Sequence, residues 1–139
     1  MSENYAYNSE LHILFVDCAP DSQFEAPPNS TKGLKLFKVP MSSDIQEMMM
    51  ADSFDCVMIR VNPGCRENLS QMKAVRNSAL EHKIPLVSLS TFNAIWIENL
   101  MGQLGVQKHF RQIPTHEELS NVLIKFASPV NEQVKGAPR

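Results

Sequence analysis

The sequence has no long apolar run, so we expect no segment that spans a membrane. Its first ten residues, MSENYAYNSE, lack the basic and then apolar layout of a signal peptide. The formal net charge is -2 and no basic stripe runs along the chain, which leaves no electrostatic footprint for nucleic acid. These absences together predict a cytoplasmic protein that binds neither nucleic acid nor membrane.

Cysteine and histidine are also scarce. The three cysteines are an odd number without CxxC spacing, and the four histidines form no HExxH pattern. Ordinary reduced thiols and ordinary histidines explain this usage. We therefore expect neither a bound metal nor a cofactor.

Short apolar segments alternate with amphipathic helical patterns along most of the chain. The expected strands cover residues 11–16, 34–39, 54–59 and 84–90 and a short segment within 106–113. The expected helices start near residue 44, cover 68–82, follow the fourth strand as far as Gly105, and end the domain at 115–126. Strands that alternate with helices predict a parallel sheet covered on both faces.

This order predicts a single α/β domain with a flavodoxin-like, doubly wound, five-stranded parallel sheet of strand order 2-1-3-4-5. The domain covers residues 11–127, between a polar N-terminal arm at 1–10 and a polar tail or linker at 128–139. The first crossover, residues 19–33, is rich in proline, so we expect its helix to be degenerate or absent.

Local signals place several helix ends and faces. The segments 43–46 and 115–118 have the form of capping boxes, and Gly105 has the position of a C-cap. The helix at 68–82 should bury one stripe, formed by Leu69, Met72, Val75, Ala79 and Leu80. The helix after the fourth strand should carry a broad apolar face that includes Phe92 and Ile95.

Polar or reactive residues stand where the expected strands end. Asp17 and Cys18 end the first strand, Arg60 the third, Ser90 the fourth and Gln112 the fifth. In this topology the carboxyl ends of the strands meet at one edge of the sheet, where binding sites form. These five residues are therefore the candidate site.

Four stretches resemble the receiver domain of bacterial response regulators: ILFVDCA, FDCVMIRVNPG, IPLVSLST and GVQKHFRQIPTHEEL. The resemblance extends over about residues 11–126 and implies a role in two-component signal transduction. A receiver has two acids after the first strand, a phosphoacceptor aspartate after the third, Ser or Thr after the fourth and Lys-Pro after the fifth. Its acids hold Mg²⁺ for phosphoryl transfer.

Most of this chemistry is missing at the matching positions. Asp17 matches the first acid, but Cys18 replaces the second; Arg60 falls at the phosphoacceptor position and Gln112 at the lysine, while Ser90 keeps the hydroxyl. An arginine repels Mg²⁺ and is no nucleophile, because it stays protonated. The resemblance thus implies an atypical, non-enzymatic pseudo-receiver without Mg²⁺, which signals through protein contacts.

Several interpretations stay open at this point. Arg60 either pairs with Asp17 or is a solvated arginine in a degenerate loop, and Cys18 and Cys65 are either unrelated thiols or a redox or metal pair. The alternative function is a small flavodoxin-like binder or enzyme for a nucleotide or phosphate ligand. It would need a Gly-rich loop after a strand, and only the turn at 62–64 comes near one.

Two surfaces are candidates for a protein interface. Without a first helix, Ile13, Phe15, Leu36 and Val39 need a cover, which the loop through Phe24, the N-terminal arm or another chain would supply. We favour a second protein chain, either a partner or a copy in a homodimer.

The second surface is on the fourth helix, where Trp96 and Ile97 are adjacent. One helix face cannot bury both fully, so either one points outward or both lie at the edge of a wide core stripe.

Overall fold

The computed structural model describes residues 10–18, 32–40, 44–51, 53–62, 68–92 and 94–126 of the chain. Its strands are β1 (Leu11–Asp17), β2 (Leu34–Pro40), β3 (Cys56–Arg60), β4 (Leu86–Leu89) and β5 (Lys108–Phe110). Its helices are α2 (Ile45–Ala51), α3 (Leu69–Glu81), α4 (Ile95–Leu104) and α5 (His116–Phe126).

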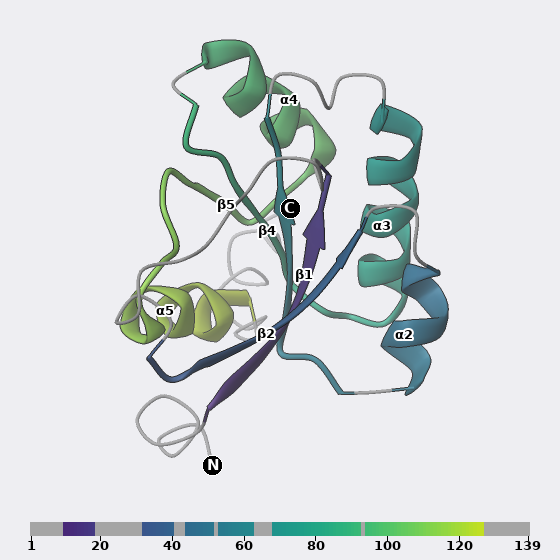
Figure 1. Cartoon of the computed structure of the whole chain (residues 1–139), viewed down its shortest axis with the longest axis vertical. Helices are drawn as coiled ribbons and strands as arrows, with labels where there is room; N and C mark the ends of the chain where they lie inside the picture. Colours follow the sequence, from purple (N-terminus) through teal and green to yellow (C-terminus); the bar gives the residue numbers. More distant parts are fainter. Residues whose placement is uncertain are drawn as a thin grey trace, which may run out of the picture.

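The strands form one parallel sheet in the order β2-β1-β3-β4-β5, which confirms the predicted flavodoxin-like, doubly wound fold. Helices α2 and α3 lie on one side of the sheet and α5 lies on the other (Figure 1). Helix α4 packs on the side of α2 and α3, because their side chains share one core. The carboxyl ends of β1 and β3 are adjacent, so the candidate site lies between the two layers of helices.

Two apolar clusters hold the layers together. Every residue of β3 is buried, as expected of a parallel strand that is covered on both faces. Alternate side chains of β1 and β3 enter opposite clusters. The cluster under α5 contains Leu11, Ile13, Phe15, Leu34, Cys56, Met58, Val87, Leu89, Phe110, Ile113, Leu119 and Leu123. The other cluster joins the sheet to α2, α3 and α4 and includes Leu14, Val16, Val57, Ile59, Met72, Val75, Ile97 and Met101.

Two of the three predicted helix ends are confirmed. The Thr115 N–H donates to Glu118 Oε1 at 2.9 Å and the Glu118 N–H donates to Thr115 Oγ1 at 3.1 Å, which completes a capping box. Gly105 has φ +92° and ends α4 in the left-handed region. The other box was placed one residue early, because it is Asp44 whose Oδ1 accepts the Glu47 N–H at 3.1 Å.

The predicted buried faces are wrong at three positions. Leu80 is 64% exposed on α3, because it points about 100° away from its buried neighbour Ala79. Phe92 precedes α4 and Ile95 begins it, and both are exposed. These apolar side chains are candidates for contact with other molecules.

Other predictions fall on residues that the structure does not describe. They include the degenerate or absent first helix, whose crossover is not described over residues 19–31, most of the N-terminal arm, and the tail. Within the described ranges, no helix has the length and apolar character needed to cross a membrane.

Candidate functional site at the strand ends

Asp17 and Arg60 are the last residues of β1 and β3, and the register of the two strands places them opposite each other. Since Ile13 and Phe15 precede Asp17 at alternate positions, its side chain leaves the sheet on the side of α5. The same alternation, through Met58, places Arg60 on that side too. The two side chains therefore meet by strand geometry.

The two side chains form a buried ion pair. Arg60 Nη2 donates to Asp17 Oδ2 at 3.2 Å and lies 3.1 Å from Oδ1. Arg60 is 7% exposed and Asp17 is 9% exposed, so water could not compensate either charge if its partner were removed. The expected pair is thus present, and Arg60 is not a solvated arginine in a degenerate loop.

Cys18 is the next residue, and it points to the opposite side of the sheet. It belongs to the cluster shared with α2, α3 and α4, and its N–H donates to the Arg60 carbonyl at 3.1 Å. Asn68, just before α3, has its Nδ2 3.5 Å from the Cys18 carbonyl oxygen and 3.3 Å from Cys18 Sγ. These contacts join the end of β1 to β3 and to the start of α3.

The prediction of ordinary reduced thiols is wrong for Cys18, which is disulfide-bonded. Cys56 is a free cysteine, as expected. Burial, and to a smaller extent the charge of Asp55, raise the pKa of the Cys56 thiol, so it stays protonated and unreactive. Cys65, the other cysteine of the sequence, lies outside the described residues.

Ser90 and Gln112 do not join the ion pair. Ser90 is 1% exposed, and its Oγ accepts the Phe92 N–H at 3.2 Å in a local turn. Gln112 is exposed after β5, and within the described ranges no hydrogen bond links it to Asp17 or Arg60. The structure thus brings together three of the five predicted site residues: Asp17 and Arg60 form an ion pair, and the Cys18 N–H is hydrogen-bonded to the Arg60 carbonyl.

Potential metal ligands are not clustered among the described residues. Among them, no three His, Cys, Asp or Glu side chains are grouped so that they could hold an ion. The carboxylate of Asp17, which the resemblance implies as a metal ligand, faces a guanidinium instead.

The first proposed interface is closed at its centre. Ile13 and Phe15 are 0% exposed and pack in the cluster that contains Leu119 and Leu123 of α5, so they are covered within this chain and do not form an interface. Leu36 is partly buried on the same side, but Val39 packs on the side of α2, α3 and α4, so its predicted place on this surface is wrong. Phe24 lies outside the described residues.

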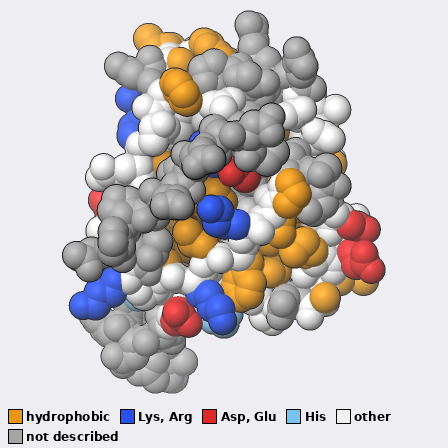
Figure 2. Space-filling view, in the orientation of Figure 1, with side chains coloured by type: hydrophobic (Ala, Val, Ile, Leu, Met, Phe, Trp, Pro, Cys, Tyr) orange, Lys and Arg blue, Asp and Glu red, His pale blue; other side chains and the backbone are white. Residues whose placement is uncertain are grey.

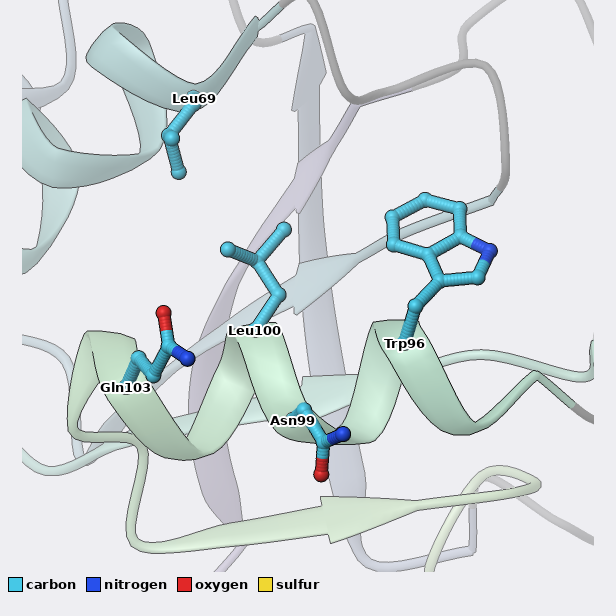
Figure 3. A pocket seen from close by; sticks show the side chains of 5 residues that line it. All are labelled: Leu69, Trp96, Asn99, Leu100 and Gln103. Atoms are coloured by element: carbon cyan, nitrogen blue, oxygen red, sulfur yellow. The ribbon is translucent and has the colours of Figure 1, made fainter.

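On α4, Ile97 is fully buried and offers no interface, whereas Trp96 is partly exposed, as expected if one of the two points outward. Trp96 borders a hollow of about 320 Å³ between α3 and α4 (Figure 3). The hollow is lined by Leu69, Trp96, Asn99, Leu100 and Gln103. Its polar lining residues carry no sequence motif that could have revealed it.

The sequence did not predict one buried polar contact. Ser88 in β4 is 0% exposed, and its Oγ lies 2.7 Å from His109 Nδ1 in β5. The two residues are 21 positions apart, so only the pairing of β4 with β5 could have predicted the contact.

No protein-family model matches the sequence, and a comparison with curated proteins finds no match.

Proposed function

We propose that this chain is a non-enzymatic, receiver-like signalling or scaffold module that acts through protein contacts and does not depend on phosphorylation. The observation that carries the proposal is the buried ion pair of Asp17 and Arg60 at the ends of β1 and β3. By the resemblance to receivers, these two positions are the ones expected to hold a metal-binding acid and the phosphoacceptor.

The chemistry of the pair supports a role without phosphoryl transfer. Phosphoryl transfer in a receiver needs a nucleophilic carboxylate and a Mg²⁺ ion held by hard oxygen ligands. Here the guanidinium of Arg60 replaces the nucleophile and brings a positive charge within 3.1 Å of the only acid that matches the family pattern, Asp17. Cys18, which takes the place of the second acid, is disulfide-bonded.

The chain should therefore gain no phosphate from acetyl phosphate in the presence of Mg²⁺. Intact-mass spectrometry before and after incubation measures this directly. A receiver with a complete site is the positive control for the donor. A mass gain of one phosphoryl group that hydroxylamine removes, and that Asp17→Asn prevents, would mean that an aspartyl phosphate forms and would contradict the proposal.

The start of α4 is the surface that best suits a protein contact. Ile95 is 73% exposed and Phe92 is 46% exposed, and along the chain both lie just before Trp96, which borders the hollow. Figure 2 shows hydrophobic side chains gathered over this end of α4, at the top of the molecule. Exposed apolar side chains of this size, beside a hollow, are typical of protein contact sites. The partner is a second copy of the chain or another protein.

For the homodimer we expect sedimentation of a dimer at micromolar concentration and of a monomer for Ile95→Asp. Because Ile95 is exposed, this change should alter the free energy of unfolding by no more than about 0.5 kcal/mol. Ile124→Asp is the matched control, since Ile124 is 38% exposed on α5 and far along the chain from α4; it should leave the dimer intact.

A wild-type monomer would exclude the homodimer and leave the second version, a different protein partner. In that case the wild type and Ile124→Asp should bind the same protein in a pull-down, and Ile95→Asp should not bind it. Equal capture by all three would mean that α4 is not the contact surface.

A further inference from the structure

The hydroxyl of Ser88 and the ring of His109 form a polar contact inside the layer between the sheet and α4. Leu86 and Ser88 alternate with Val87 and Leu89, which face α5, so Ser88 faces α4. His109 likewise alternates with Phe110, which packs on the α5 side. The 2.7 Å contact between Ser88 Oγ and His109 Nδ1 thus bridges β4 and β5 beneath α4.

The other ring nitrogen of His109 is buried. Its Nε2 is inaccessible to water and has no hydrogen-bond partner in the described part of the chain. A neutral imidazole tolerates this position, because one of its nitrogens bonds to Ser88 and the other carries no full charge. An imidazolium does not tolerate it, because its Nε2–H would be a charged donor without an acceptor.

Charged side chains connect the surroundings of His109 to α4. Glu98 of α4 forms an ion pair with Arg111, which follows β5 directly. This pair ties the helix to the end of the strand on which His109 lies (Figure 3 shows β5 running beside α4). Among the described residues, the charge of Glu98 raises the pKa of the His109 ring and that of Arg111 lowers it.

We propose that His109 is an acid-sensitive contact: the neutral ring joins β5 to β4 through Ser88, and its protonation disturbs the end of β5, the Arg111–Glu98 pair that links this end to α4, and the surface around Trp96. To give the charged Nε2–H an acceptor or a water molecule, the ring has to leave this position, which displaces the strand end that Arg111 links to α4. The inference goes beyond the proposed function and does not depend on it, because the change occurs within one chain.

The direction of the pH effect follows from the burial of the ring. Burial lowers the pKa of His109 from its usual value of 6.5; the charge of Glu98 raises it and that of Arg111 lowers it. A group whose pKa is lower in the folded chain binds its proton less readily there than in the unfolded chain. The stabilisation is therefore complete above pH 6.5 and is lost as the pH falls through the lowered pKa.

The experiment uses Trp96, the only tryptophan of the sequence, as a reporter on α4. Its emission should shift to longer wavelength as the pH falls from about 8 to about 5, the range in which histidine titrates, with a midpoint below 6.5. His109→Gln keeps a hydrogen-bonding group next to Ser88 but cannot titrate, so its emission should stay constant over this range.

His82→Gln is the matched control. The Nε2 of His82 is also buried without a partner among the described residues, but His82 caps α3 and not α4. This variant should therefore keep the wild-type fluorescence step. A wild type without a step, or a step that persists in His109→Gln, would overturn the inference.

If His109→Gln does not fold, the wild type alone still decides. NMR titration of the His109 ring protons should give the same midpoint as the Trp96 fluorescence, and a different midpoint would overturn the inference.

Discussion

Replacement of Asp17 by alanine is expected to lower the free energy of unfolding by about 3 kcal/mol, the lower end of the range for breaking a buried ion pair. The variant keeps Arg60 at 7% exposure but removes the carboxylate 3.1 Å from its Nη2. The buried guanidinium then loses the carboxylate that faces it, so most of the loss comes from its desolvation and not from the missing attraction. Urea unfolding followed by circular dichroism measures the change.

The double variant Asp17→Ala with Arg60→Ala separates the ion pair from simple loss of packing. It removes both charges, so it should be more stable than the sum of the two single losses predicts, by about 1–3 kcal/mol. A replacement that fills the same space, Asp17→Leu with Arg60→Met, should be as stable as the wild type or more stable. Additive single changes would mean that the two side chains do not interact.

The exposed pair of Glu98 and Arg111 is the matched control for this cycle. Its side chains are 39% and 50% exposed, respectively, so water screens their attraction. Glu98→Ala should cost less than about 1 kcal/mol, as exposed ion pairs do. The contrast between the two pairs tests burial as the cause, because both join a carboxylate to a guanidinium.

The meeting of Asp17 and Arg60 could be predicted from the sequence, and so could the strand order. Both follow from one pattern: short apolar strands alternate with helices, and such strands run parallel, with their carboxyl ends at the same edge. The box from Thr115 to Glu118 was equally predictable, because it depends on four consecutive residues.

Contacts between distant segments were not predictable. The number of cysteines does not reveal which sulfur atoms come close enough to bond, so the disulfide at Cys18 was missed. Ser88 is a polar residue in an otherwise apolar strand, so the sequence suggests a buried hydroxyl without a partner. Its partner, His109, follows only from the register of β4 with β5. Ile95 is a residue type that usually lies in the core, and its exposure depends on the rotation of α4 about its own axis relative to the sheet.

Gly33→Ala is expected to destabilise the chain by about 2 kcal/mol or more, from left-handed backbone strain of about 1–2 kcal/mol together with a steric clash. Gly33 has φ +79°, which side chains with a Cβ rarely adopt. A Cβ at this position would lie 2.9 Å from Cδ2 and 3.3 Å from Cβ of His116, at the start of α5. The ring could turn away, but its Cβ is held by the helix.

Gly33 also lies where β1 and β2 begin, and this limits how far its backbone can move to relieve the clash. The Gly33 carbonyl accepts the Leu11 N–H at 2.9 Å, where β1 begins, and β2 begins at the next residue. A shift that relieves the clash with His116 would disturb this bond between β1 and β2. Thermal unfolding by circular dichroism should therefore show a clear fall in the melting temperature.

The same substitution at Gly102 is the control, and it should have the opposite sign. Gly102 lies within α4, and a Cβ there would meet nothing within 4 Å. Gly102→Ala should stabilise the chain by about 0.5–1 kcal/mol, because alanine loses less conformational entropy in a helix. Equal effects at the two positions would contradict the structural assignment of Gly33.

A second double-mutant cycle separates the two causes of the destabilisation by Gly33→Ala. In a His116→Ala background the ring is gone, so Gly33→Ala should retain the backbone strain, about 1–2 kcal/mol, and the 3.3 Å approach to the Cβ at position 116. If the cost is unchanged in this background, the clash with the ring contributes nothing, and the close approach of β2 to α5 does not require glycine. If the cost vanishes, the backbone at this position is not in the left-handed region.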